Sequence, residues 1–133
     1  MGRFITKTAK DQDLYIEWST IVDAPTAVFE SAEELRQYLI EEYGMAEASR
    51  ADRTISRAQE TGSSVMGFKV GTWDDDMLVV MEGAPPRPSG GHLWYLPRER
   101  QTAYARALLA DDPNEANNQL LLIQVEDHEE LED

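Results

Sequence analysis

The sequence predicts an α+β fold: a single domain in which an antiparallel sheet of about four to six strands packs with about two to four helices. Three observations support this. The 133 residues are 41% hydrophobic and 29% charged, as is typical of a globular chain. Segments with the alternating pattern of strands are interspersed with segments that have helical spacing. The domain is expected over residues 1–125, and residues 126–133, "EDHEELED", form an acidic tail.

Two strands and a hairpin are predicted first. Residues 3–9, "RFITKTA", alternate apolar and polar positions and indicate a short strand. Residues 13–22, "DLYIEWSTIV", place Leu14, Ile16 and Trp18 on one face and Tyr15, Glu17 and Ser19 on the other. This pattern predicts a half-buried strand with Glu17 on the solvent face. "DAP" at 23–25 should end it, and "TAVF" should return antiparallel.

Two helices should follow the hairpin. Ser31 and Glu34 have the spacing of a capping box, and the first helix carries an apolar stripe at Leu35, Tyr38, Leu39 and Tyr43. The second helix is expected over residues 45–62 and should end at Gly62. Its stripe is thin and consists mainly of alanines, which predicts a helix that lies on the surface or docks a partner.

The second half of the chain is less regular. Residues 63–73 and 77–83, joined by the turn "DDD", predict a second hairpin, and the Pro- and Gly-rich residues 83–91 predict an exposed loop. "HLWYL" reads as a strand, and Pro97 should open a helix over "PRERQTAYARALLADD". The run "QLLLIQVE" fits a buried strand or a helix that begins at Pro113. We favour the helix, extending through Leu122.

Three arginines recur at helical spacing on the second predicted helix, at positions 50, 53 and 57. Residues three and four apart share one face of a helix, so Arg50, Arg53 and Arg57 could together grip an anionic ligand. The alternative interpretation is that they offset neighbouring acidic residues in an acidic protein.

Aromatic residues and one carboxylate are further candidates for a binding site. Tyr15, Trp18, Trp73, Trp94 and Tyr95 could line a pocket or an interface, because aromatic rings supply large contact areas, or they could form the core. Glu17 and Ser19 are not explained by the predicted scaffold. If it were buried, Glu17 would be a candidate acid for a two-carboxylate hydrolase or a ligand contact.

Several kinds of chemistry are excluded or disfavoured. The chain has no cysteine, so disulfides and thiolate catalysis are excluded. His92 and His128 have no partner spacing, and no phosphate-binding loop or nucleophile-elbow motif occurs. The pairs Asp11–Asp13 and Asp74–Asp76 could hold a divalent cation, but such pairs are common in turns. We therefore predict no catalytic residue, no metal and no cofactor.

The net charge of −14 limits the partners. The tail holds six of the 26 acidic residues and no Lys or Arg, which leaves about −8 on the first 125 residues. Direct binding to nucleic-acid phosphates is therefore not expected. No apolar run reaches the roughly 18 residues of a membrane span, and the N-terminus lacks a secretion signal, so a cytoplasmic protein without membrane contact is expected.

Three segments together resemble small acidic proteins of actinobacteria and their phages, a group without an assigned function. These segments are "DLYIEWSTIVDAPTAVFESAEEL", "RADRTISRAQETGSS" and "LPRERQTAYARALL", and the similarity runs through most of the chain. The loop "APPRPSGG" departs from that pattern. The resemblance implies an actinobacterial cytoplasm, in a phage-related context, and it implies no catalytic or binding residue.

Three functional hypotheses remain. The leading one is a small acidic interaction module that binds and modulates an unidentified host or phage protein, with homodimerisation left open. The second is a decoy that mimics nucleic acid and occupies the basic groove of a DNA- or RNA-binding protein. The third is a small-molecule binder or carboxylate-dependent enzyme that uses Glu17 and the aromatic residues. Enzymatic activity is the least favoured.

Overall fold

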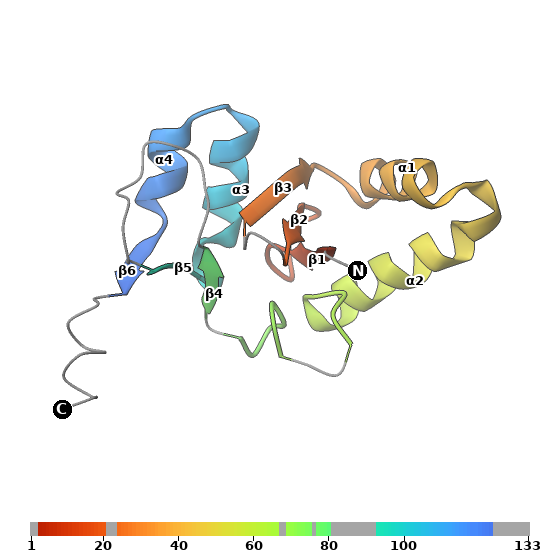
Figure 1. Cartoon of the computed structure of the whole chain (residues 1–133), viewed down its shortest axis with the longest axis horizontal. Coiled ribbons are helices and arrows are strands. Elements are labelled where there is room, and N and C mark those ends of the chain that lie inside the picture. Colours follow the sequence, from red (N-terminus) through yellow and green to blue (C-terminus); the bar gives the residue numbers. More distant parts are fainter. Residues whose placement is uncertain (1–2, 21–23, 67–68, 76, 81–92, 124–133) are drawn as a thin grey trace.

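The first half of the chain forms a three-stranded antiparallel sheet and a pair of helices (Figure 1). The computed structural model describes residues 3–20, 24–66, 69–75, 77–80 and 93–123. Strands β1 (Arg3–Lys7), β2 (Tyr15–Ser19) and β3 (Ala24–Phe29) pair in the order β1-β2-β3. The predicted first strand and the return of the chain after Pro25 are both confirmed.

A β-bulge between β2 and β3 shapes the centre of this sheet. Glu17 pairs with Ala27 and Trp18 pairs with Pro25, so Thr26 is the extra residue of the bulge. Proline has no backbone N–H to donate, and a bulge is one of the few places in a sheet where it is tolerated. The bulge directs Thr26 at Glu17: the threonine hydroxyl donates to Glu17 Oε1 at 2.7 Å.

Helices α1 (Ala32–Tyr43) and α2 (Ala48–Thr61) lie together on one side of the sheet (Figure 1), with a short 3-10 turn, η1 (Met45–Glu47), between them. The predicted N-cap of α1 is confirmed, because the Glu34 backbone N–H donates to the Ser31 hydroxyl at 3.1 Å. The predicted end of α2 is confirmed too. Gly62 follows Thr61 with φ +92°, a left-handed conformation that glycine adopts without steric cost.

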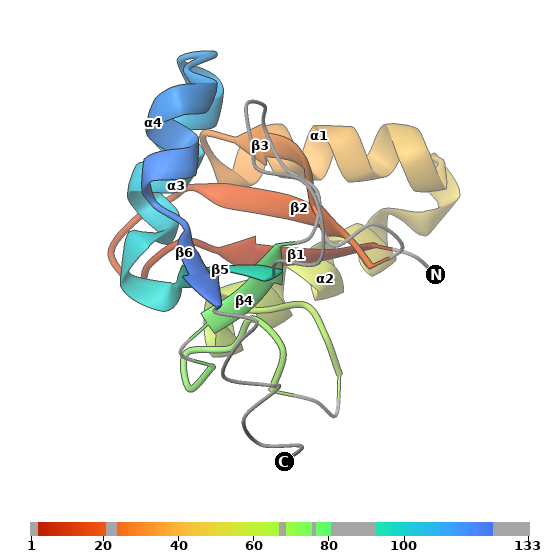
Figure 2. The ribbon, with the colours of Figure 1, turned by 60° about the vertical axis from the view of Figure 1, so that its left-hand side comes forward.

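The β1–β3 sheet is covered on both faces, as Figures 1 and 2 show. On one face Tyr15 packs with Ile5, Phe29 and buried residues of α1 and α2. On the other, Ile16 and Trp18 pack with residues of the C-terminal helices and strands. The prediction of a half-buried β2 was therefore wrong. The alternating residues of β2 point to two opposite faces of the sheet, and both faces are buried because a pair of helices covers each of them.

The second half of the chain forms another small sheet and two helices. Strands β4 (Met77–Val80), β5 (Leu93–Pro97) and β6 (Leu121–Ile123) pair antiparallel in the order β4-β5-β6. A 3-10 turn, η2 (Arg98–Arg100), leads into α3 (Gln101–Leu109), and α4 (Pro113–Asn118) follows. Tyr104 of α3 is fully buried, and its ring stacks on Trp18 with centroids 6.1 Å apart. This stacking joins the C-terminal half to the first sheet.

Four further details of the predicted fold need correction, although the α+β class is confirmed. The six described strands form two three-stranded sheets, so no sheet reaches the predicted four to six strands. The second hairpin was wrong: β4 pairs with β5, and residues 64–66 and 69–75 form turns and irregular backbone. The favoured helix through Leu122 was also wrong, since α4 ends at Asn118 and the apolar run becomes β6. Finally, the strand from residue 13 ends at Ser19.

Arg98 ties three separate segments together at the end of β1. Its guanidinium donates to the carbonyls of Lys7 at 2.7 Å, Thr8 at 2.9 Å and Gly62 at 3.4 Å. The same group lies 4.5 Å from the ring centroid of Trp73. Burial lowers the pKa of Arg98 to about 10, which leaves it charged at neutral pH. These contacts make Arg98 a structural cation.

The acidic tail, the Pro- and Gly-rich loop and both histidines lie outside the described residues. The same holds for Asp23 and Asp76. The domain boundary near residue 125 therefore stays a prediction.

Candidate functional site

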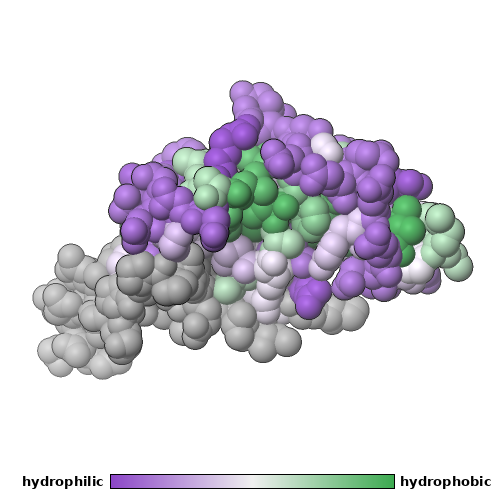
Figure 3. Space-filling model, turned by 90° about the horizontal axis from the view of Figure 1, so that it is seen from above, coloured by the Kyte–Doolittle hydropathy of each residue, from purple (hydrophilic) through white to green (hydrophobic). Residues whose placement is uncertain are grey.

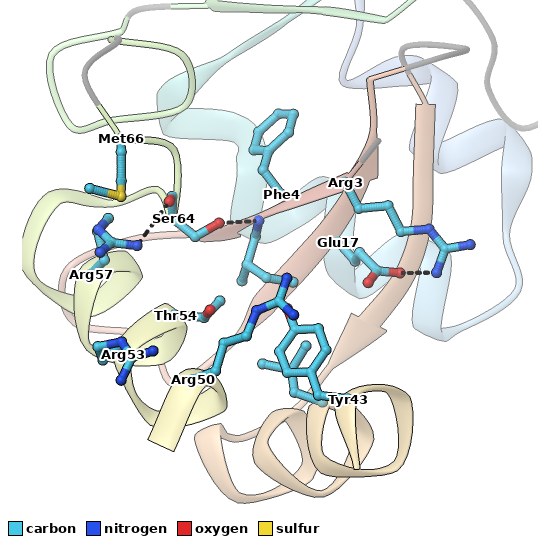
Figure 4. Close-up of a pocket in the computed structure, with 12 residues that line it drawn as sticks. Arg3, Phe4, Glu17, Tyr43, Arg50, Arg53, Thr54, Arg57, Ser64 and Met66 are labelled. Carbon is cyan, nitrogen blue, oxygen red and sulfur yellow. Dashed lines mark hydrogen bonds and ion pairs between the residues drawn. The ribbon is translucent and has the colours of Figure 1, made fainter. Parts of the chain in front are cut away.

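A pocket with a volume of about 530 Å³ opens between α2, β1 and the segment that follows α2 (Figure 4). Its charged lining consists of Arg3, Arg50, Arg53, Arg57 and Glu17. Its other lining residues are Phe4, Ile5, Leu39, Tyr43 and Met66, together with the hydroxyl residues Thr54 and Ser64. We call this cavity the arginine pocket. It concentrates four of the 12 basic residues of a chain whose net charge is −14.

Helix α2 places three arginines on one wall because of its two-sided sequence. Ala51, Ile55 and Ala58 are buried against the sheet and α1. Residues 50, 53 and 57 follow the spacing i, i+3, i+7, which keeps them on one face at the edge of that buried stripe. The helix is thus anchored by small residues and presents long cationic side chains to the pocket.

Two of these arginines are held by contacts that leave their charge available. The Arg50 guanidinium lies 4.1 Å from the ring centroid of Tyr43, a cation–π contact. Arg57 donates to the Ser64 carbonyl at 3.4 Å. Neither of them, nor Arg53, forms an ion pair with any carboxylate among the described residues.

Other arginines of this protein behave differently. Arg36 on α1 binds Asp52 at 2.7 Å, and Arg3 lies 3.5 Å from Glu42. Acidic residues of α1 and α2 therefore pair with Arg36 of α1 and Arg3 of β1. The interpretation that the α2 arginines offset neighbouring acids finds no ion pair to support it in the described part of the chain.

Glu17 contributes a buried carboxylate to the opposite wall. It is only 4% exposed, so its predicted position on the solvent face was wrong. Oε1 accepts hydrogen bonds from Thr26 at 2.7 Å and from the Tyr38 hydroxyl at 3.0 Å, and Arg3 Nη1 lies 3.8 Å away. Oε2 receives no hydrogen bond from the residues that the structure describes. One carboxylate oxygen is thus fixed by the scaffold, and the other is left for the pocket.

The environment of Glu17 changes the acidity of its neighbour Tyr38. Burial and the hydrogen bond to the Glu17 carboxylate together raise the pKa of Tyr38 to about 12. The tyrosine therefore remains a hydrogen-bond donor to Glu17 throughout the physiological range. This donor fixes the orientation of the carboxylate.

The structure brings together four of the eight predicted site residues and separates the other four. Glu17, Arg50, Arg53 and Arg57 line the arginine pocket. Tyr15 is fully buried, and its hydroxyl accepts a hydrogen bond from Gln59 at 3.2 Å, while Ser19 is a half-buried residue at the end of β2.

The two predicted tryptophans lie elsewhere. Trp73 donates its indole N–H to the Glu60 carbonyl at 3.0 Å and stacks on Arg98, which makes it part of the scaffold. Trp94 on β5 packs against the cluster that contains Trp18. Neither tryptophan lines the arginine pocket, and their role in binding stays a prediction.

Sequence reasoning missed Arg3, Thr54, Ser64 and Met66 as pocket residues. Arg3 had a detectable signal: in the β1–β2 hairpin Ile5 pairs with Glu17, so Arg3, two residues earlier, lies on the same face. Ser64 enters through an irregular backbone segment that pairs with β1, where Ser64 Oγ accepts from Ile5 N at 2.9 Å. No sequence pattern predicts that contact.

The described residues form neither a metal-binding cluster nor a membrane-spanning helix. Within residues 3–20, 24–66, 69–75, 77–80 and 93–123, no group of three His, Asp or Glu side chains is placed to hold a metal ion. Asp13, one of the candidate ligands, accepts a hydrogen bond from the Ala32 backbone N–H at 3.1 Å at the start of α1. No helix in the described part of the chain combines the length and apolar character that a membrane crossing requires.

Comparison with known proteins returned no matching family model, no matching curated protein and no matching solved structure. The geometry of the arginine pocket is therefore the basis for assigning a function.

Proposed function

We propose that this protein is a non-catalytic binding module that recognises an anionic group in the arginine pocket. The observation that carries the proposal is the row of Arg50, Arg53 and Arg57 along one wall, without an ion-paired carboxylate among the described residues. Like charges at this spacing destabilise a helix by roughly 0.2–0.5 kcal/mol per pair. The row therefore costs helix stability, and binding of an anion is the function that offsets this cost.

The chemistry of the side chains supports an anionic ligand. Guanidinium groups present planar arrays of N–H donors that match phosphate and carboxylate oxygens. The pocket volume of about 530 Å³ falls within the roughly 300–1,000 Å³ range of small-molecule sites. The strongly negative surroundings repel long polyanions, whereas a small anion can enter a locally positive cavity.

Calorimetric titration with inorganic pyrophosphate at low ionic strength tests this proposal. We expect saturable binding with one site per chain, weakened by about tenfold or more in Arg53→Gln. Arg106→Gln is the matched control, because Arg106 lies on α3 outside the pocket and contacts Gln12. If Arg53→Gln and Arg106→Gln lose the same affinity for pyrophosphate, the binding depends only on the net charge of the protein and the pocket is not the site. If the wild type does not bind pyrophosphate, the proposal is wrong.

Protein interaction is a second candidate function, and a specific feature favours it. Figure 3 shows an apolar area in the middle of the face seen from above, over the region of β3. In the described sheet β3 is an edge strand, and Ala27 and Val28 on it are only half-buried. Exposed edges pair readily with other strands. We expect the partner at this edge to be a second copy of this chain. Sedimentation velocity should then detect a dimer in the wild type, and Val28→Lys should abolish it.

The decoy hypothesis remains a prediction. It is tested by measuring how the affinity for a nucleic-acid-binding protein changes with salt concentration, and a decoy should lose affinity steeply as the salt concentration rises.

A further inference from the structure

The spacing of the cationic side chains sets the shape of the anion, given the proposed function. Residues 50 and 57 are seven apart on α2, and a helix rises about 1.5 Å per residue, so their backbones lie about 10 Å apart along the axis. Figure 4 shows Arg57 and Arg53 on one side of the pocket and Arg50 nearer its centre. A row of this length fits two linked anionic groups better than one.

Two hydroxyl groups lie on the same side as this row. Thr54 comes directly after Arg53 on α2 and lines the pocket, and its hydroxyl has no hydrogen-bond partner among the described residues. Ser64 Oγ already accepts from Ile5 N, so its own O–H is the group left to donate. Hydroxyl donors beside guanidinium groups are well suited to the several acceptor oxygens of a phosphate.

The opposite wall has a different chemistry. Glu17 Oε2 accepts no hydrogen bond from any described residue, although Oε1 accepts two. Glu17 lines the pocket, and a carboxylate oxygen in a partly desolvated site is stabilised by a hydrogen-bond donor. Ile5 and Leu39 also line the cavity and are almost fully buried. This wall therefore suits an organic group that carries hydroxyl or amino donors, and a bare inorganic anion would leave it unused.

We infer that the ligand of the arginine pocket is an organic diphosphate, whose phosphates lie along Arg50, Arg53 and Arg57 and whose organic part donates a hydrogen bond to Glu17. Four arginines and one glutamate line the cavity. The resulting excess of positive charge is comparable to the charge of an ionised diphosphate. A nucleoside diphosphate has this chemistry, because its ribose supplies hydroxyl donors.

The test compares adenosine diphosphate with inorganic pyrophosphate by calorimetry, without divalent cations, on the wild type and on Glu17→Gln. The substitution preserves shape: the amide oxygen can still accept from Thr26 and Tyr38, while an N–H₂ donor replaces Oε2. We expect the wild type to bind adenosine diphosphate about tenfold more tightly than pyrophosphate. Glu17→Gln should lose that advantage, yet bind pyrophosphate as well as or better than the wild type, because a negative charge has left the pocket.

Glu17→Gln should thus weaken the binding of adenosine diphosphate and not that of pyrophosphate. This difference tests the inference separately from the proposed function. If the two probes bind equally, or if Glu17→Gln weakens both alike, the organic diphosphate is wrong and anion binding stands. If neither probe binds the wild type, both are wrong. Should Glu17→Gln unfold, saturation-transfer NMR on the wild type replaces it. Contacts from the ribose protons would support the inference, and their absence with bound phosphate would overturn it.

Discussion

Arg98 and the three arginines of α2 have the same side chain but different surroundings. Arg98 donates to three backbone carbonyls and stacks on Trp73, so its N–H donors serve the fold. Within the described part of the chain Arg53 has no contact of this kind, and Arg50 and Arg57 each have one. Arg98 is thus held by the fold through several contacts, whereas the donors of the α2 arginines are largely unused within the described protein, and our proposal assigns those donors to a ligand.

The largest effect is expected from removing the structural cation. Arg98→Leu leaves the carbonyls of Lys7 and Thr8 without their donor and should lower the free energy of unfolding by about 4 kcal/mol. Urea denaturation followed by tryptophan fluorescence measures this loss. Arg98→Lys keeps the charge without the planar array of donors and should recover only part of it. A loss below about 1 kcal/mol in Arg98→Leu would contradict the structural role.

A smaller loss is expected at the residue against which Arg98 packs. A Cβ on Gly62 would lie 2.7 Å from Arg98 Nη2 and 2.8 Å from Trp73 Cδ2, at a backbone φ of +92°. Gly62→Ala should therefore cost about 2 kcal/mol through steric crowding and backbone strain together. Thermal unfolding measures this cost, and an unchanged melting temperature would show that the Arg98–Trp73 contact is not tight.

The third effect depends on pH. The Tyr38 pKa is raised to about 12 from its ordinary value of 10.0, so the folded state holds the phenol proton more tightly than the unfolded state. Its contribution is fully present below pH 10 and is lost as the pH rises through about 12. Tyr38→Phe should lower stability by about 1 kcal/mol at neutral pH, and this difference should shrink above pH 10.

Ultraviolet difference titration provides an independent check on Tyr38. Subtracting the curve of Tyr38→Phe from that of the wild type should isolate one phenol ionisation near pH 12. A midpoint at the ordinary value of 10.0 would show that Tyr38 does not donate to the Glu17 carboxylate.

The smallest change in stability is expected in the pocket itself. Arg53→Gln removes a cation that has no ion pair within the described structure, and it relieves like-charge repulsion along α2. Its free energy of unfolding should stay within about 0.5 kcal/mol of the wild type, as measured by the same urea denaturation. A loss as large as that of Arg98→Leu would erase the distinction between the two kinds of arginine.

Local patterns in the sequence predicted most of the elements and the β2–β3 hairpin, but not the pairing of the C-terminal strands. The Ser31 cap, the end of α2 at Gly62 and the start of a helix at Pro113 depend on neighbouring residues, and all three are confirmed. The burial of Glu17 depends on α1 and α2, which cover a face of β2 that alternation alone left open to solvent. The pairing of β4 with β5 depends equally on contacts between distant residues.

The candidate site was predictable to the same extent. Helical spacing identified Arg50, Arg53 and Arg57, since a single helix brings them together. Arg3 and Ser64 reach the pocket through strand register and an irregular segment, which spacing along the chain does not encode. Trp73 lies outside the pocket and stacks on Arg98, a contact between distant residues that the spacing of aromatic residues along the chain does not encode.

Arginine-detected NMR during a pyrophosphate titration tests the central distinction most directly. Each arginine Nε–Hε group reports its own surroundings, so the structural and the available cations are observed in one experiment. The account predicts that the signals of Arg50, Arg53 and Arg57 shift together and saturate, while the Arg98 signal stays in place. Equal shifts for all arginines, or no shift in the pocket, would contradict it.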